Sequence, residues 1–147
     1  MGIDTKIVSP AKFTLSKNDG FKAKISIFHC FTALSDLSFL NNEDSEIQSI
    51  KMPCSSMTRD VFLLRAFEAG ADSVIVFVCP EGTCRYLQGN LRAAKRVARV
   101  KKILDEIGLD GRRLNIFNIP HGDRNTVNRI VGQVVSDLGN LGPNPAK

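Results

Sequence analysis

The sequence lacks the features that mark several common classes of protein. It contains no tryptophan, one tyrosine and two histidines, and it has neither of the glycine-rich loops that typically hold nucleotide phosphates. No apolar run approaches the roughly 20 residues needed to cross a bilayer, and the first residues lack the hydrophobic region of a signal peptide. We therefore expect a cytoplasmic protein with no direct membrane insertion.

Recognisable sets of catalytic residues are missing as well. No Ser/His/Asp arrangement and no pair of carboxylates stands out in the 147 residues, so we expect a non-catalytic subunit rather than an enzyme that acts alone. The four cysteines carry the clearest chemistry in the chain. In a reducing compartment, cysteines more often bind metal or do redox chemistry than form structural disulfides.

Positive charge is concentrated in one segment. Residues 85–113 hold nine Lys or Arg and three acidic residues, whereas the rest of the chain is close to neutral within a total of +5. Aromatic residues are not interleaved with this charge, which argues against nucleic-acid binding. We interpret the segment as a solvated helix face or as a docking surface for an acidic partner.

Hydrophobic patterning predicts strands that alternate with helices. Strands are expected at residues 24–29, 46–51, 73–78 and 113–119. Helices are expected at residues 32–40, from a cap within 55–58 to 67, at 89–107 and at 123–138. Right-handed crossovers of this length predict a three-layer, flavodoxin-like α/β fold, with a parallel sheet of about four strands and helices on both faces.

The same patterning predicts the extent of the domain. An α/β domain at residues 23–139 is expected between an N-terminal arm at 1–22 and a C-terminal tail at 140–147. The longest predicted helix has an inner stripe that comprises Leu91, Ala94, Val97, Ala98, Ile103, Leu104 and Ile107.

The four cysteines follow the predicted strands. Cys30, Cys54 and Cys79 each lie at or just beyond the carboxyl end of a strand, and Cys84 comes one turn after Cys79. Because parallel strands all finish at one edge of a sheet, we expect these thiols to gather there. The alternative is four unrelated cysteines that are buried in the core.

Several centres are compatible with four thiolates. Tetrahedral zinc and iron–sulfur clusters both accept them, and Cys79 and Cys84 alone could act as a thiol–disulfide switch. The chain has a C-x4-C pair and two remote cysteines but no C-x-x-C pair, which is closer to a [2Fe–2S] arrangement than to structural zinc. A zinc-stabilised interaction module stays open as an alternative.

The run C-P-E-G-T-C-R-Y-L-Q-G-N from Cys79 to Asn90, preceded by A-F-E-A-G-A-D-S-V-I-V, resembles the methyl-viologen-reducing hydrogenase delta-subunit family. Members are small iron–sulfur electron-transfer subunits that accompany heterodisulfide-reductase-type flavoproteins. The likeness covers residues 24–119. The residues that match the most specific motif are Gly70, Ala71, Asp72, Cys79, Gly82, Cys84, Tyr86, Gly89 and Asn90.

The resemblance implies a cofactor and partners. It implies that a [2Fe–2S] cluster is held by Cys30, Cys54, Cys79 and Cys84. One implied partner is a flavin-containing, heterodisulfide-reductase-A-like subunit, and the other is a hydrogenase, formate dehydrogenase or other reductase subunit.

Three further residues are candidates for the surroundings of such a cluster. Arg85 and Tyr86 directly follow Cys84, where donors could hydrogen-bond to cluster sulfurs and raise the reduction potential. For Tyr86, packing beneath the loop is the alternative. His29 precedes Cys30 and is interpreted as a supporting or core histidine rather than as an iron ligand.

Overall fold

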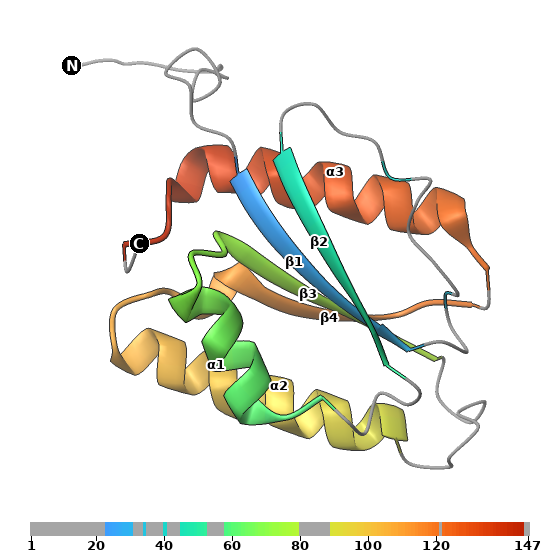
Figure 1. The fold of residues 1–147 in the computed structure, drawn as a ribbon, viewed down its shortest axis with the longest axis horizontal. Helices are drawn as coiled ribbons and strands as arrows, with labels where there is room; N and C mark the ends of the chain where they lie inside the picture. Colours follow the sequence, from blue (N-terminus) through green and yellow to red (C-terminus); the bar gives the residue numbers. More distant parts are fainter. Residues whose placement is uncertain are drawn as a thin grey trace.

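The computed structural model describes residues 23–30, 34, 40, 45–52, 58–79, 89–120 and 122–145. Within these residues, four parallel strands form one sheet in the order β2-β1-β3-β4 (Figure 1). The strands are β1 (Ala23–Cys30), β2 (Ser45–Met52), β3 (Ser73–Val78) and β4 (Leu114–Asn118). The predicted parallel sheet is therefore confirmed.

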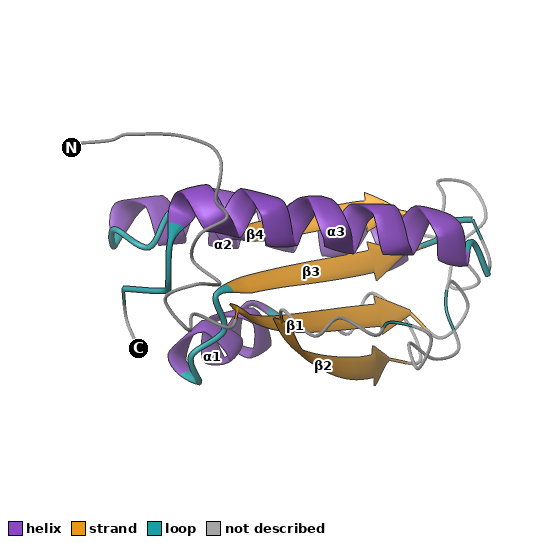
Figure 2. Cartoon of the chain, turned by 90° about the horizontal axis from the view of Figure 1, so that it is seen from above, coloured by secondary structure: helices purple, strands orange, loops and turns teal. Residues whose placement is uncertain are grey.

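Helices in the described part of the chain cover both faces of this sheet (Figure 2). α1 (Asp60–Glu68) and α2 (Gly89–Glu106) pack on one face, and α3 (Arg124–Leu141) packs on the other. Successive residues of β3 point to opposite faces, so Val76 joins the core beneath α1 and α2 while Phe77 joins the core beneath α3. The predicted three-layer α/β architecture is confirmed.

One short helix precedes the last strand. A short 3-10 helix, η3 (Gly111–Arg113), leads into β4. The described helices include none that has both the length and the apolar composition of a membrane span.

The start of α1 differs from the predicted one. The helix begins at Asp60, and Arg59 occupies the N-cap position without a capping hydrogen bond from its side chain. Thr58, a predicted cap, instead donates its hydroxyl proton to the Met52 sulfur at 3.2 Å. The other predicted caps, at residues 55–57, and almost all of the helix predicted at 32–40 lie outside the described residues.

The predicted inner stripe of α2 is partly wrong. Its exposed members are Leu91, Ala94, Ala98 and Ile107. The residues that pack on the sheet are Ala93, Val97, Val100 and Leu104. These four follow one another at intervals of four, three and four residues, which places them on one face of a helix. Hydrophobic character alone, without that spacing, gave the wrong positions.

The last helix extends further than predicted, and the segment after it makes buried contacts. α3 continues to Leu141, beyond its predicted end at residue 138. Asn144 is only 3% exposed, and its backbone N–H donates to the Asp72 carboxylate at 2.8 Å. Asp72 also accepts the backbone N–H of Lys24 at 2.8 Å. These contacts fasten the C-terminal segment to the amino edge of the sheet, where β1 and β3 begin.

Candidate metal centre at the carboxyl edge of the sheet

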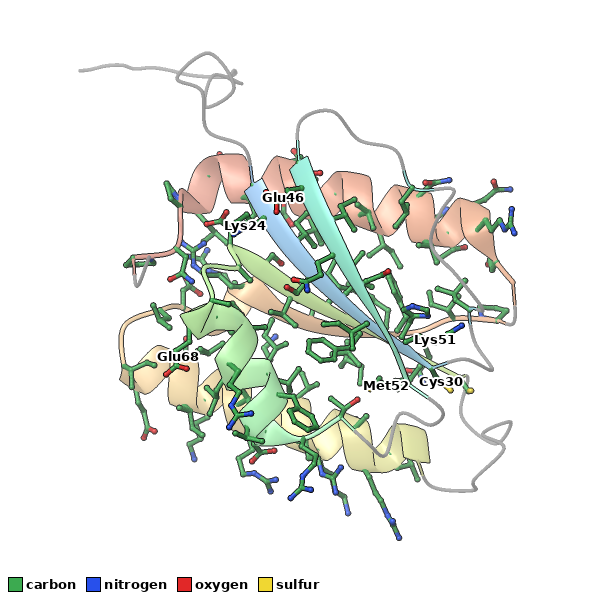
Figure 3. All side chains as sticks on the ribbon, viewed as in Figure 1. Lys24, Cys30, Glu46, Lys51, Met52 and Glu68 are labelled. Carbon is green, nitrogen blue, oxygen red and sulfur yellow. The ribbon has the colours of Figure 1, made fainter. Side chains whose placement is uncertain are left out.

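Two cysteines meet at the opposite, carboxyl edge of the sheet. Cys30 is the last residue of β1, and Cys79 follows the last residue of the neighbouring strand β3. Their Sγ atoms are 3.7 Å apart, and each residue is 2% exposed (Figure 3). This separation is far longer than the roughly 2.05 Å of a disulfide bond, so the two sulfurs are not bonded to each other. The prediction that separate strands bring cysteines together at one edge is confirmed for this pair, whereas their role as metal ligands stays a prediction.

The spacing of the two sulfurs fits a shared metal. A metal–sulfur bond of about 2.3 Å with tetrahedral angles places two thiolates about 3.8 Å apart. The observed separation of 3.7 Å agrees with that value. Thiolates are soft ligands that favour zinc or iron–sulfur centres over magnesium or calcium. The residues at this edge therefore fit a tetrahedral thiolate centre.

The backbone around both cysteines is held by hydrogen bonds. The Leu34 N–H donates to the Cys30 carbonyl at 2.9 Å. His29 is buried, and its Nδ1–H donates to the Leu34 carbonyl at 2.9 Å. Because a carbonyl oxygen only accepts, this contact assigns the proton to Nδ1. His29 thus supports the chain that leaves β1, as the sequence interpretation of a supporting histidine expects.

Asn118 supports Cys79 in a similar way, and sequence reasoning missed it. Its Nδ2–H donates to the Cys79 carbonyl at 2.7 Å, and the next N–H, from Ile119, donates to the Val78 carbonyl at 2.8 Å. The available signal was its position, since Asn118 is the polar last residue of β4 and therefore reaches the same edge as the cysteines.

The remaining predicted site residues lie outside the described residues. These are Cys54, Cys84, Arg85 and Tyr86. Among the residues that are described, no group of three or more His, Cys, Asp or Glu side chains is arranged to hold a metal ion. The described half of the predicted site is thus the pair Cys30 and Cys79.

Positive side chains of α2 contact the start of α1. Arg96 Nη1 donates to the Thr58 carbonyl at 3.0 Å, and Arg99 makes two hydrogen bonds to the Asp60 carboxylate, at 2.6 and 3.0 Å. The Arg99 guanidinium holds the pKa of Asp60 below its usual range, and the carboxylate raises the pKa of Arg99. These contacts join the two helices.

The fold and this site define a class: a parallel α/β domain with a buried thiol pair at the carboxyl edge of its sheet. The family model for the methyl-viologen-reducing hydrogenase delta subunit matches residues 33–142. The chain belongs to that family, as the sequence resemblance predicted.

Individual relatives agree with this membership. The chain is 35% identical over 101 residues to the vhu iron–sulfur subunit of the F420-non-reducing hydrogenase of Methanocaldococcus jannaschii, covering 69% of this chain and 75% of that protein. The protein of the same name from Methanococcus maripaludis is 35% identical over 103 residues, which is 70% of this chain and 77% of the relative.

A longer relative is also similar to most of the chain. It is the polypeptide designated A in the ferredoxin/F(420)H(2)-dependent CoB-CoM heterodisulfide reductase of Methanosarcina acetivorans, and it is 32% identical over 116 residues. This match covers 78% of the present chain but only 15% of the longer protein. A region similar to this chain therefore occurs as a small part of a larger polypeptide.

Proposed function

We propose that this protein is an electron-transfer subunit that carries a [2Fe–2S] cluster on Cys30, Cys54, Cys79 and Cys84. The observation that carries the proposal is the pair of buried cysteines with Sγ atoms 3.7 Å apart. Two thiolates at this distance suit one tetrahedral iron, and a [2Fe–2S] cluster needs two such pairs. When bound, such a cluster accepts and donates single electrons.

Chain length supports Cys54 as a third ligand. Met52 is the register partner of Cys30 across β1 and β2, and Cys54 comes two residues after Met52. Two residues of backbone span at most about 7 Å. Cys54 is therefore tethered close to Cys30, while Cys84 is tethered to Cys79 through the short C-x4-C interval.

The chain's own residues would protect and adjust the centre. Burial of Cys30 and Cys79 limits their contact with water. His29 and Asn118 position the backbone of the two cysteines through their carbonyl contacts. We further propose that Arg85 and Tyr86 donate hydrogen bonds to the sulfurs, because they directly follow Cys84; such donors raise the reduction potential of a cluster.

The relatives' names support the proposed setting. They are iron–sulfur subunits of hydrogenases and one polypeptide of a heterodisulfide reductase. We propose a cytoplasmic complex in which this chain passes electrons between a hydrogenase, formate dehydrogenase or other reductase module and a flavin-containing, heterodisulfide-reductase-A-like partner. The Methanosarcina protein supports the second partner, since it contains a region like this chain within the A polypeptide itself.

Protein purified without air provides the test. We expect broad visible absorption that bleaches with dithionite, together with about two iron and two sulfide per chain. The Cys79→Ser variant should lose the iron and the colour, because serine removes one of the paired sulfurs. Asn144→Ala is the matched control, since it weakens the opposite edge of the sheet and touches no predicted ligand, and it should keep the cluster.

Other results of this experiment would support a different function or a different set of ligands. A colourless protein with one zinc per chain would replace the cluster with the zinc-stabilised module. A metal-free protein with a titratable dithiol would favour the thiol–disulfide switch. Normal iron content in folded Cys79→Ser would overturn the ligand assignment while leaving the cluster itself in place.

A further inference from the structure

Cys30 and Cys79 are placed to bond to each other when they hold no metal. Their Sγ atoms are 3.7 Å apart, and a disulfide bond is about 2.05 Å long. Each Sγ atom therefore needs to move by less than about 1 Å, which a modest rotation of each side chain about χ1 supplies. The side chains alone can thus close the gap between the two sulfurs.

The backbone positions of the two cysteines also suit a disulfide. β1 and β3 are neighbouring strands in which His29 lies opposite Phe77. Continuing this register places Cys79 one residue further along the edge than Cys30. Strands about 4.8 Å apart, with about 3.3 Å per residue, put the two Cα atoms roughly 6 Å from each other. Disulfide bonds join residues whose Cα atoms are about 4.4–6.8 Å apart, so this pair needs no change in the sheet.

Hydrogen bonds to the main chain hold both cysteines in this arrangement. The Cys30 carbonyl accepts the Leu34 N–H, and the Cys79 carbonyl accepts the Asn118 Nδ2–H. Neither contact involves a sulfur atom, so both can persist when no metal is bound. We therefore expect the two thiols to stay side by side in the metal-free protein.

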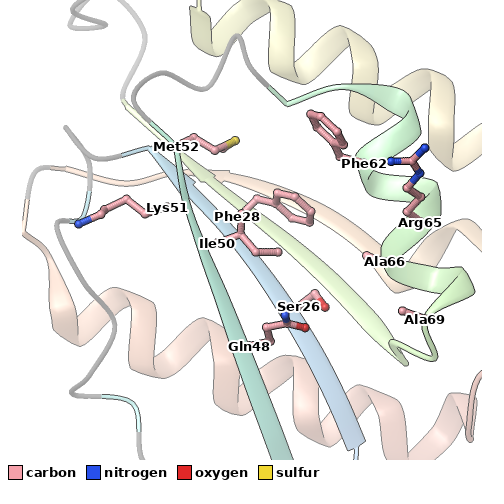
Figure 4. A pocket seen from close by; sticks show the side chains of 10 residues that line it. All are labelled: Ser26, Phe28, Gln48, Ile50, Lys51, Met52, Phe62, Arg65, Ala66 and Ala69. Atoms are coloured by element: carbon pink, nitrogen blue, oxygen red, sulfur yellow. The ribbon is translucent and has the colours of Figure 1, made fainter.

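Met52 brings another sulfur near Cys30 but cannot take the place of Cys79. It is the register partner of Cys30 in β2, so the two side chains lie on the same face of the sheet. The Met52 side chain is directed towards α1 (Figure 4), and its Sδ accepts the hydroxyl proton of Thr58 at 3.2 Å. A thioether has no S–H group and forms no disulfide. Among the described residues, Cys79 is therefore the sulfur partner available to Cys30.

We propose that Cys30 and Cys79 form a disulfide bond when the protein holds no metal, and that this bond must be reduced before a cluster is assembled. The inference rests on the proposed function for the role of these cysteines as ligands. The oxidant is a low-molecular-weight disulfide. One cysteine thiolate attacks it and releases one small thiol, and the other thiolate then attacks the mixed disulfide and releases the second. The two cysteines lose two electrons and two protons in all, and the oxidant gains them as two thiols.

This pairing differs from a switch made of Cys79 and Cys84. The Cys30–Cys79 bond joins two strands of the sheet and removes two of the four proposed ligand thiolates together, so metal cannot bind in the usual way. It also keeps both sulfurs in a reversible state, whereas oxidation of a free cysteine to the sulfinic acid is largely irreversible. The bond would store the empty site in a form that a reductant returns to use.

Peptide mapping of the full chain tests the pairing. Metal is removed with a chelator and a thiol reductant, and the protein is then kept overnight without air in a buffer of oxidised and reduced glutathione. The long incubation is needed because each cysteine is 2% exposed, so exchange requires local opening of the site. N-ethylmaleimide then blocks the remaining thiols. Trypsin separates Cys30 from Cys54, and cleavage after Glu81 separates Cys79 from Cys84.

We expect most of the wild-type chain to carry the Cys30–Cys79 link after this treatment, and cluster-loaded protein to lack it. Cys30→Ser should lose the link and leave Cys79 blocked by maleimide. Cys84→Ser is the matched control, since it removes a different cysteine and should keep the link. Cobalt(II) is the probe for the effect on metal binding: its thiolate absorption bands should be at least about fivefold weaker in oxidised than in reduced wild-type protein, and dithiothreitol should restore them. Circular dichroism checks that each variant is folded.

The outcomes separate this inference from the proposed function. A predominant Cys79–Cys84 or Cys30–Cys54 link, or four thiols that stay unlinked, would overturn the pairing even in protein that carries its cluster when purified without air. Equal cobalt binding by oxidised and reduced protein would overturn the block on assembly. A Cys30–Cys79 link in a protein that never carries a cluster would keep the pairing and overturn the electron-transfer function.

Discussion

Replacing Asn144 with alanine should lower the free energy of unfolding by about 2–3 kcal/mol, although this residue lies in a segment predicted to be a tail. Asn144 is 3% exposed. Its Nδ2 donates to the Phe67 carbonyl at 3.0 Å and to the Ala71 carbonyl at 2.7 Å. Alanine removes both of these hydrogen bonds, while the backbone contact to Asp72 can persist.

The size of the expected loss in unfolding free energy depends on whether each carbonyl acceptor keeps another hydrogen-bond donor in the variant. The Phe67 carbonyl still accepts the Gly70 N–H at 3.0 Å, so losing its Asn144 donor should cost about 1 kcal/mol. The Ala71 carbonyl loses its Asn144 donor within a buried site, and an unsatisfied buried group costs about 1–3 kcal/mol. Water that partly enters the site reduces the cost at the Ala71 carbonyl. The losses at the two carbonyls together therefore come to about 2–3 kcal/mol.

Thermal unfolding followed by circular dichroism measures this effect. In a chain of this size, each kcal/mol shifts the Tm by about 2–4 °C, so Asn144→Ala should melt about 4–12 °C below the wild type. Asn140→Ala is the control, because Asn140 is exposed on α3 and its replacement should change stability by less than about 0.5 kcal/mol. Equal melting of the two variants would show that the segment is not docked in solution and would refute the reasoning.

Two other predictions concern stability. Arg112 lies beside Asp110 and lowers the pKa of that carboxyl to about 2, below its ordinary 3.8. The contact therefore stabilises the fold above about pH 4, and this stabilisation is lost as the pH falls towards 2. The urea midpoint of wild type should therefore fall more steeply over that range than the midpoint of Asp110→Asn, and parallel curves would contradict the assignment. Gly70 has φ +103°, where side chains with a Cβ are strained, so Gly70→Ala should lower the free energy of unfolding by about 1–2 kcal/mol; an unchanged urea midpoint would contradict this.

The sheet was predictable because its signals are local. The limits of β3 match the prediction of residues 73–78, since a continuous β-branched and aromatic run is bounded by polar residues and turns. The meeting of Cys30 and Cys79 was predictable from topology, because adjacent parallel strands end at one edge. Neither inference needed the details of side-chain packing.

The C-terminal contacts were not predictable in this way. Arg113 donates to the carbonyls of Leu141, Gly142 and Pro143, which lie about thirty residues further along the chain. Asn144 bonds to residues more than seventy positions earlier. Nothing in the local composition around Pro143 distinguishes a docked segment from a free tail, so only the assembled fold reveals its role.

Position along β3 also separates the roles of residues that belong to one family motif. Asp72 immediately precedes the strand and Cys79 immediately follows it, and a strand of this length at about 3.3 Å per residue separates them by roughly 20 Å. Asp72 is fully buried and accepts backbone N–H groups from Lys24 and Asn144. It is too distant to bind a metal held by Cys79, so its place in the motif reflects folding of the amino edge. The proposed role in metal binding therefore does not extend to the aspartate of the motif.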